Sequence, residues 1–133
     1  MKQQLPEECL NPPGFLKTCG VRYDWLDEDS CAASCELRPE LCNMHGHAHG
    51  GLIFTLMDTA ASRAAAHYHG TDRLVVSQCA SIHFLRKASG TRLTAKSHVR
   101  HSGRTRSFVS VELFADDSDT LLAVAEFEVF NLS

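Results

Sequence analysis

The chain has 133 residues, of which 44% are hydrophobic and 22% charged, the balance of one ordinary globular domain with a single core. Its formal net charge of −3 argues against a dedicated nucleic-acid-binding protein. Asp58 and Arg63 interrupt the longest apolar run, and the first residues lack the apolar core of a signal peptide. We therefore expect one domain over residues 1–133 of a cytoplasmic protein, with no nucleic-acid or membrane partner.

The first third of the chain predicts a hairpin before any long element. Phe15 and Leu16 begin a short helix or loop. Residues 20–26 and 30–37 read as two β-strands, because the acidic residues 27–29 supply the turn between them.

Residues 43–66 combine a glycine-rich turn with a strongly apolar helix. The turn ends at His49-Gly50-Gly51. Apolar residues then recur at the three- and four-residue spacing of a helix: Leu52, Ile53, Leu56, Met57, Ala60, Ala61 and Ala64. Phe54 and Ala65 add apolar surface on the other side, so we expect the helix to be covered on most of its circumference.

One carboxylate, Asp58, lies in the middle of this helix. The residues three and four positions away are Phe54, Thr55, Ala61 and Ser62, and none carries a positive charge. Burying a carboxylate without a partner is unfavourable. Asp58 is therefore either an acid satisfied by solvent or by the core, or a functional acid or nucleophile.

Four strands are predicted after the helix, at residues 74–85, 92–100, 104–114 and 121–130. The first is expected to place Val76, Ala80, Ile82 and Phe84 on one face and Ser77 and Ser81 on the other. The later strands alternate, with these residues facing inward: Leu93, Ala95, Ser97, Val99, Val109, Val111, Leu113, Leu121, Ala123, Ala125, Phe127 and Val129. One apolar helix wrapped by a curved antiparallel sheet satisfies this order of elements.

A pattern of six residues in the turn and helix resembles the active-site signature of hotdog-fold acyl-CoA thioesterases, in their phenylacetate-degradation (PaaI-like) branch. The pattern is Asn-x-x-Gly-x-x-His-Gly-Gly-x6-Asp, formed by Asn43, Gly46, His49, Gly50, Gly51 and Asp58. The resemblance covers most of the chain. It implies an α+β hotdog fold with one long central helix wrapped by a curved antiparallel sheet of roughly six strands. It also implies an acyl-CoA substrate, no cofactor, and a homodimer that pairs again into a homotetramer.

The two glycines of this pattern suit an oxyanion hole. The amides of Gly50 and Gly51 are unpaired at the start of a helix, where the dipole favours the negative charge that a thioester carbonyl develops under attack. A glycine also leaves room for the thioester to approach. The alternative is a turn that merely requires glycine. His49 is expected to orient the turn and to contact the thioester oxygen.

The resemblance gives the remaining roles to Asp58, Asn43 and Ser77. Asp58 acts either as a general base toward water or as a nucleophile that forms a mixed anhydride, and both routes stay open. Asn43 positions the water or the carboxylate, and Ser77 holds the attacking water near the acid. The alternatives are an ordinary turn asparagine and an ordinary strand serine.

The spacing of these residues predicts that each site is shared by two chains. Gly51 and Asp58 are seven residues apart, which is about 10 Å along one helix. Both groups must reach one thioester carbon, and an attacking atom must come within about 3–3.5 Å of it. We therefore expect Asn43 and the glycines of one chain to face Asp58 and Ser77 of another.

Basic residues are concentrated in one segment. Residues 86–106 hold seven of the thirteen lysines and arginines and no acid. The segment is either a solvated strand face or a site for the phosphates of coenzyme A, which arginine suits well. We expect the phosphate contacts to be Arg86, Lys87, Arg104 and Arg106.

The histidines and cysteines predict neither a metal site nor a thiol nucleophile. His45, His47 and His49 alternate, but a zinc site usually adds a second cluster, for which His67 and His69 are the only candidates. The six cysteines include no Cys-x-x-Cys pair and read as free thiols. No metal ligand is therefore expected.

The function predicted from the sequence is hydrolysis of an acyl- or aryl-CoA to the free acid and coenzyme A. The main alternative is a non-catalytic acyl-CoA-binding or regulatory hotdog protein, which has no need of a buried acid such as Asp58. A dehydratase of the same fold fits the His-Gly-Gly-x6-Asp pattern less well. Phe54, Met57, Phe84 and Phe108 belong either to an apolar or aromatic acyl pocket or to the core.

Overall fold

The computed structural model describes residues 4–70 and 74–132. Its elements, in chain order, are α1 (Glu7–Leu10), α2 (Phe15–Cys19), β1 (Val21–Leu26), β2 (Ser30–Glu36), the 3-10 turn η1 (Pro39–Leu41), α3 (Gly50–His69), β3 (Val75–Phe84), β4 (Arg92–Ser102), β5 (Arg106–Ala115) and β6 (Leu121–Asn131). The predicted hairpin, long helix and four later strands are confirmed, with boundaries shifted by a few residues. Helix α1 was not predicted.

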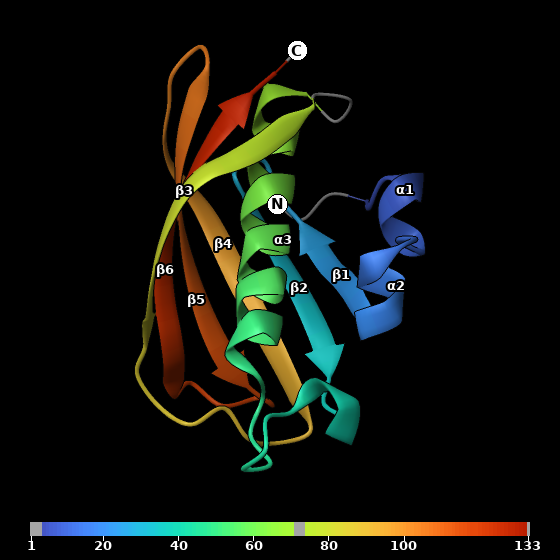
Figure 1. Ribbon diagram of the computed structural model, residues 1–133. Helices are drawn as coiled ribbons and strands as arrows, with labels where there is room; N and C mark the ends of the chain where they lie inside the picture. The colour runs from blue at the N-terminus through green and yellow to red at the C-terminus, as the bar shows by residue number, and fades with distance from the viewer. Residues whose placement is uncertain (1–3, 71–73, 133) are drawn as a thin grey trace.

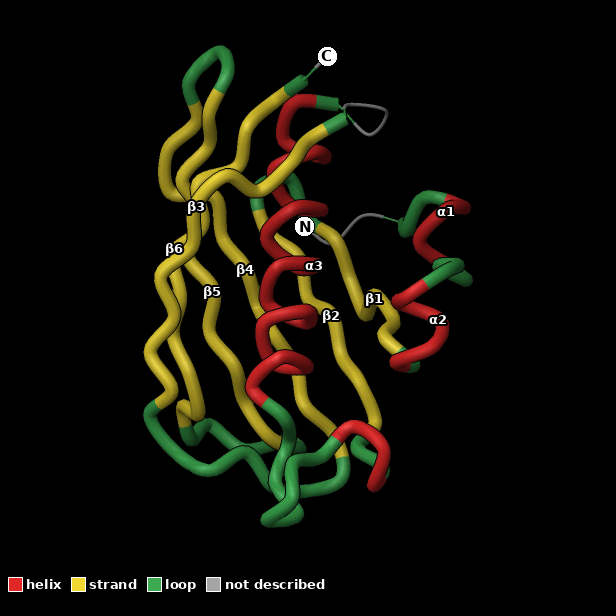
Figure 2. The backbone as a smooth tube through the Cα atoms, viewed as in Figure 1, coloured by secondary structure: helices red, strands yellow, loops and turns green. Residues whose placement is uncertain are grey.

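The strands form one six-stranded antiparallel sheet in the order β1-β2-β4-β5-β6-β3 (Figure 2). β1 and β3 are its edges, so the last three strands lie between the β1–β2 hairpin and β3. The inward faces of β4 and β5 are as expected, because Leu93, Ala95, Val109, Val111 and Leu113 are all buried. Alternation of apolar and polar residues therefore sets which face of these strands packs against the helix.

Helix α3 crosses one face of this curved sheet, as Figure 1 shows. Its inner side buries Leu56, Met57, Ala60, Ala61 and Ala64 completely. The small alanines let the helix approach the sheet closely, while Leu56 and Met57 fill the space above β4 and β5. Burial of each such large side chain contributes about 1.5–3 kcal/mol. The helix is therefore fixed rigidly to the sheet, and so are the side chains on its outer side.

The outer side of α3 is not covered within one chain, so the expectation of a helix covered on most of its circumference is wrong. Phe54 is 42% exposed, and Gly51 is exposed beside it. Thr55, Asp58 and Ser62 are half-buried on the same side. The sheet wraps only one side of the helix, and α1 and α2 flank it rather than cover it (Figure 1).

Strand β3 also departs from the predicted alternation. Its pairing with β6 shifts register between Ser77 and Cys79, which marks a β-bulge. The extra residue turns Ser77 toward α3, while Val76 is 41% exposed and Ser81 stays on the outer face. Ser77 and Ser81 therefore lie on opposite faces of the sheet, contrary to the expectation that they share one.

One long helix packed on a six-stranded antiparallel sheet is the hotdog fold, so the fold expected from the resemblance is confirmed. In the part of the chain that the structure describes, none of the helices combines the length and the apolar character that crossing a bilayer requires.

Candidate active site

The loop before α3 is held together by Asn43. Its side-chain Oδ1 accepts hydrogen bonds from the amides of His45 at 2.9 Å and His47 at 3.2 Å. The Asn43 amide donates to the carbonyl of His47 at 2.7 Å, and Gly46 turns the chain with φ +79°. The geometry therefore places the Asn43 side-chain oxygen inside its own loop, where it shapes the turn that leads into the helix.

His49 is the N-cap residue of α3. Its Nδ1 accepts a hydrogen bond from the Gly51 amide at 2.8 Å, and its carbonyl accepts from the amides of Leu52 and Ile53. A Cβ on Gly51 would lie only 3.0 Å from this ring nitrogen, so a larger residue there would push the His49 ring away from the Gly51 amide. Of the two glycine amides, the Gly51 amide is therefore occupied by His49. The Gly50 amide makes no hydrogen bond within the described residues.

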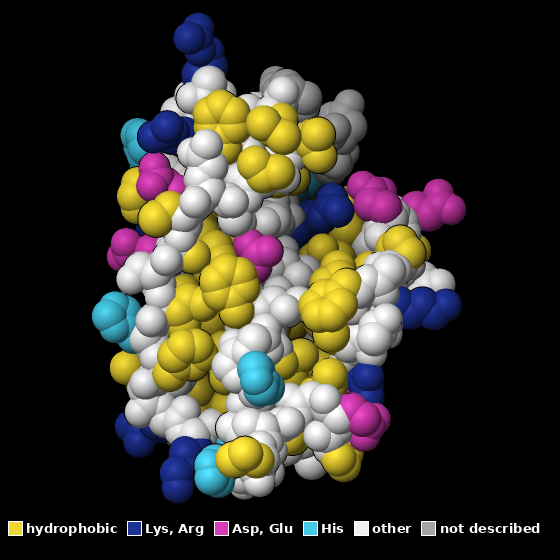
Figure 3. All heavy atoms as spheres, viewed as in Figure 1, with side chains coloured by type: hydrophobic (Ala, Val, Ile, Leu, Met, Phe, Trp, Pro, Cys, Tyr) yellow, Lys and Arg dark blue, Asp and Glu magenta, His cyan; other side chains and the backbone are white. Residues whose placement is uncertain are grey.

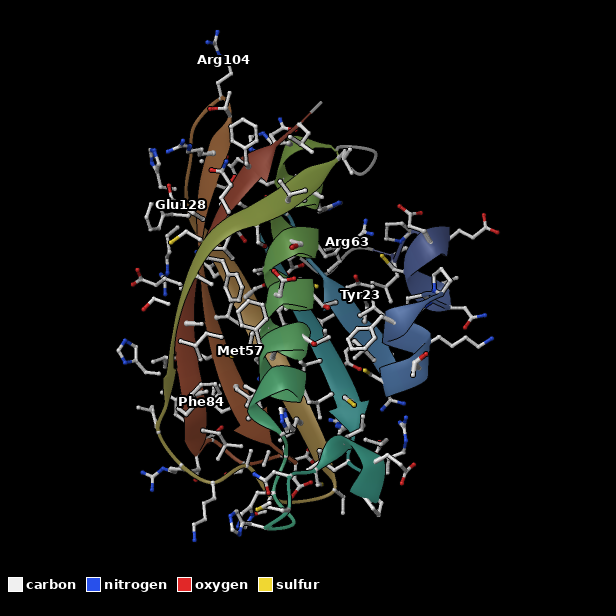
Figure 4. All side chains as sticks on the ribbon, viewed as in Figure 1. Tyr23, Met57, Arg63, Phe84, Arg104 and Glu128 are labelled. Carbon is white, nitrogen blue, oxygen red and sulfur yellow. The ribbon has the colours of Figure 1, made fainter. Side chains whose placement is uncertain are left out.

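Phe84 completes the surroundings of this first helical turn. A Cβ on Gly50 would lie 3.7 Å from the tip of the Phe84 ring, an ordinary van der Waals contact. The ring is 57% exposed, so it is not part of the core. Figure 4 shows it beside the start of α3, on the side away from α2. Gly50 is thus half-buried, at the positive end of the helix dipole and next to an exposed aromatic ring.

Asp58 lies two turns further along the outer side of α3 and has a hydroxyl partner. The Ser77 Oγ donates a hydrogen bond to Asp58 Oδ1 at 2.5 Å, and the Ser62 Oγ lies 3.3 Å from the same Ser77 oxygen. The bulge in β3 makes this contact, because regular alternation would point Ser77 to the other face. Asp58 is half-buried rather than fully buried, so its carboxylate is held by Ser77 and is still open to the outer side.

The two parts of the candidate site are far apart within one chain. Gly50 and Asp58 are eight residues apart on a continuous helix, which is about 12 Å along its axis. Asn43, His49 and Gly50 thus form one group at the start of α3, and Asp58 with Ser77 forms a second group near its middle. Asp58 faces the uncovered side of the helix, and Figure 3 shows apolar side chains on either side of α3.

The four expected phosphate contacts also fall into two groups. Arg86 and Lys87 lie in the loop after β3, where the Arg86 amide donates to the Leu122 carbonyl at the start of β6. Arg106 pairs in register with Phe130 at the end of β6, about 27 Å away along the strand. Figure 4 shows Arg104 at the tip of the β4–β5 hairpin, at the opposite end of the molecule from Phe84.

One of these cations already has an acidic partner. Arg106 Nη1 lies 3.5 Å from Glu128 Oε1, and the Arg106 side chain is 60% exposed. Exposed pairs of this kind contribute little to stability and leave the guanidinium free to rearrange. The four residues are thus not one cluster within a chain.

The cysteines are poorly placed for nucleophilic chemistry. Burial raises the pKa of the Cys31 thiol to about 12, and it also raises the pKa of Cys9 and Cys35. These three thiols therefore stay protonated and unreactive. Cys79 is exposed on β3, away from the helix, because it follows the bulge.

The alternating histidines have separate surroundings. His45 is exposed, and the buried Nδ1 of His47 has no hydrogen-bond partner in the described chain. Within residues 4–70 and 74–132, no three His, Cys, Asp or Glu side chains come together as metal ligands. The absence of a metal from the site stays a prediction.

One long helix that starts at a glycine turn and packs on a six-stranded antiparallel sheet places the chain among the hotdog proteins. The chain belongs to the thioesterase superfamily, whose family model matches residues 45–122. That match includes the His49-Gly50-Gly51 turn, all of α3 and the strands β3, β4 and β5.

Individual relatives agree with this family. Acyl-coenzyme A thioesterase PaaI of Escherichia coli strain K12 is 28% identical over 106 residues, covering 79% of this chain and 74% of PaaI. The crystal structure of AziG from S. sahachiroi has a TM-score of 0.82 and 29% identity, covering 90% of this chain and 97% of AziG. Conserved protein PA5202 of Pseudomonas aeruginosa has a TM-score of 0.87 and 25% identity, covering 96% of this chain and all of PA5202.

Proposed function

We propose that the protein hydrolyses the thioester of an acyl- or aryl-CoA, releasing the carboxylic acid and free coenzyme A. The observation that carries this proposal is the uncovered side of α3. The helix carries, at Gly50, an amide without a hydrogen-bond partner among the described residues and, two turns further on, a carboxylate held by Ser77. The named activity of the relative PaaI, an acyl-CoA thioesterase, supports the same reaction class.

Gly50 supplies the electrostatic part of the proposed mechanism. Its amide N–H and the positive end of the α3 dipole stabilise the negative charge that forms on the thioester oxygen during attack. His49 fixes the turn by accepting the Gly51 hydrogen bond, and Asn43 fixes the preceding loop. Asn43 and His49 therefore position the oxyanion donor, and the Gly50 amide rather than the Gly51 amide contacts the oxygen.

Asp58 promotes the attack on the thioester carbon, either by activating water or by attacking the carbon itself. As a general base it accepts a proton from water while the water oxygen bonds to the thioester carbon; the carbon–sulfur bond then breaks and the proton passes to the leaving sulfur. As a nucleophile it bonds to the carbon itself, expels the thiolate, and water then cleaves the mixed anhydride. In both routes Ser77 orients the carboxylate through its hydrogen bond to Asp58 Oδ1.

Each complete site requires two chains. The roughly 12 Å between Gly50 and Asp58 prevents one chain from offering both to one carbon. A two-fold dimer with antiparallel α3 helices places Gly50 of one protomer opposite the partner's Asp58, and it yields two equivalent sites. The free edge of β3 supports this arrangement, since an unpaired edge strand favours pairing with a second copy. Two such dimers would then associate into a tetramer.

The same dimer accounts for the two groups of basic residues. Antiparallel packing brings the β4–β5 hairpin of one protomer to the end of its partner that carries the β3–β4 loop. Arg86 and Lys87 of one chain and Arg104 and Arg106 of the other then lie at one end of the assembly. We propose that they bind the phosphates of coenzyme A together, because neither group alone brings four cations to one place.

The test is thiol release from a panel of acyl- and aryl-CoA substrates in the presence of a chelator. We expect the wild type to turn over at least one of them. Asp58→Asn keeps the shape and the acceptor for Ser77 but removes the charge, so it should lose at least about 100-fold in kcat. Asp119→Asn, an exposed acid in the β5–β6 turn, is the matched control and should retain full activity. Equal kcat in the two variants contradicts the proposal.

A further inference from the structure

A groove lies between α2, η1 and the first two turns of α3. It has a volume of about 440 Å³, in the range of about 300–1,000 Å³ typical of small-molecule pockets. The buried side chains of Cys19 and Leu52 form its floor, and the half-buried Leu41 and Cys42 line one side. Phe15, which is 65% exposed, stands at its outer wall. Cys19 and Leu52 belong to the hydrophobic core and Leu41 packs against it, so the groove opens onto the edge of the core.

The inner end of the groove is the turn that holds the proposed oxyanion donor. His49 and Gly51 both line it, and so does Thr55 one turn further along the helix. Figure 4 shows Phe84 on the other side of α3, and the loop with Arg86 and Lys87 continues directly from that strand. A thioester whose oxygen lies at the Gly50 amide therefore has a basic loop on one side and the apolar groove on the other.

The charges around the groove decide what it accepts. Arg38 is the only cation in its lining, and its guanidinium already donates to the carbonyls of Thr18 and Cys19 at the end of α2 and to Glu40. Glu40 already balances the charge of Arg38, and three of the five N–H donors of Arg38 are in use, so a second carboxylate would meet no net positive charge in the groove. The groove is therefore suited to an uncharged apolar group.

We infer that this groove binds the acyl group of the substrate and selects apolar, uncharged chains or rings over acyl groups that end in a carboxylate. The inference rests on the proposed function for the position of the thioester. In this arrangement coenzyme A extends toward Arg86 and Lys87, and the acyl group passes His49 into the groove. The carboxylate of the released acid then lies at the N-terminus of α3, where the helix dipole favours an anion.

The first experiment narrows the groove by placing a bulky side chain at an exposed position. A substitution there does not disturb the core. Thr18 is exposed on α2 and lines the groove, whereas its neighbour Lys17 is exposed and does not. The measured quantity is the ratio of kcat/KM for decanoyl-CoA to kcat/KM for acetyl-CoA. We expect Thr18→Trp to lower this ratio at least about tenfold, because the indole occupies space that the long chain requires. Lys17→Trp should leave the ratio within about twofold of the wild type. An unchanged ratio in Thr18→Trp overturns the inference.

A binding measurement separates this inference from the proposed function. Isothermal titration calorimetry is run with decanoate and with the eight-carbon dicarboxylate suberate on the wild type, Thr18→Trp and Lys17→Trp. We expect decanoate to bind the wild type and Lys17→Trp equally, and to bind Thr18→Trp at least about tenfold more weakly. Suberate should bind the wild type at least about tenfold more weakly than decanoate. This pattern supports the inference that the groove binds an apolar acyl group. If no acyl-CoA is hydrolysed, that result refutes only the proposed function. Absence of decanoate binding to the wild type, or equal binding of both acids, overturns the inference.

Discussion

Replacing Ser77 with alanine removes a hydrogen bond that holds the carboxylate of Asp58. The bond is 2.5 Å long and has an ionised acceptor when Asp58 is charged. Hydrogen bonds to charged groups contribute about 1.5–3 kcal/mol, and water can replace part of this one because both residues are half-buried. We therefore expect Ser77→Ala to lower the free energy of unfolding by about 1.5 kcal/mol, the low end of that range. This corresponds to a fall in Tm of roughly 5 °C for a chain of this size.

The effect on catalysis should be larger than the effect on stability. Without Ser77 the carboxylate can rotate about its side-chain torsions, and a misplacement of about 1 Å reduces the rate by about 100-fold. We expect kcat to fall about 10- to 100-fold with little change in KM, because Ser77 is not proposed to contact the bound ground state. The assay is thiol release at saturating and at low acyl-CoA, with thermal unfolding measured on the same preparation.

Ser81→Ala is the matched control, since Ser81 lies on the same strand beyond the bulge and on the outer face. It should change the free energy of unfolding by less than about 0.5 kcal/mol and leave kcat unchanged. A double-mutant cycle between Ser77→Ala and Asp58→Asn then measures the coupling free energy between the two side chains in unfolding. We expect this coupling free energy to be about 1 kcal/mol or more. If Ser77→Ala behaves like Ser81→Ala in both assays, the Ser77–Asp58 contact does not position the acid and the reasoning is refuted.

Two further predictions concern the basic residues and an exposed acid. Arg86→Ala and Arg104→Ala should each raise KM for an acyl-CoA more than KM for the matching acyl-pantetheine, which lacks the nucleotide phosphates; equal effects on both substrates would assign the two arginines to the fold. Asp116 has its pKa lowered by hydrogen bonds from the hydroxyl and amide of Thr91 and from the amide of Arg92. Because the pKa of Asp116 is lower in the folded state, its ionised carboxylate stabilises the folded protein at pH values above the unfolded-state pKa of about 4. This stabilisation is lost as the pH falls through the folded-state pKa. Thermal unfolding between about pH 6 and pH 2.5 should therefore show a steeper loss of Tm for the wild type than for Asp116→Asn, and parallel curves would contradict this assignment.

The order of the elements and the start of α3 could be predicted from the sequence, whereas α3 continues to His69, past the predicted residues 43–66. The glycine turn, the helical period after Leu52 and the alternation in β4 and β5 each reflect local physics: backbone freedom, burial of one face and the two-residue pleat. The positions of His49 and Asp58 on one helix follow from the same pattern. The hydrogen bond from the Gly51 amide to His49 could have been anticipated too, since a histidine immediately before two glycines is in place to cap the helix.

The contact between Ser77 and Asp58 could not be derived from alternation. A β-bulge inserts one residue, so every side chain before it points to the opposite face of the sheet from the one that alternation predicts. The residues around Ser77 include no glycine or proline that would indicate a bulge in the sequence. The uncovered side of α3 was missed because an apolar residue that is exposed in the folded chain looks like a core residue in sequence. The groove beside α2 was missed for a related reason: Cys19, Leu41 and Leu52 come together only when distant segments pack.

The most direct test of a thioesterase site shared between two chains is complementation. Asn43→Ala breaks the loop before α3, and Asp58→Ala removes the acid, so each variant alone should be nearly inactive. The two proteins are unfolded together in equal amounts, refolded, and assayed for acyl-CoA hydrolysis, while native mass spectrometry counts mixed dimers. Random pairing makes about half of the dimers mixed, each with one intact site of two, so about a quarter of the wild-type activity should return. A mixture that contains mixed dimers but stays as inactive as its parents would contradict the shared site.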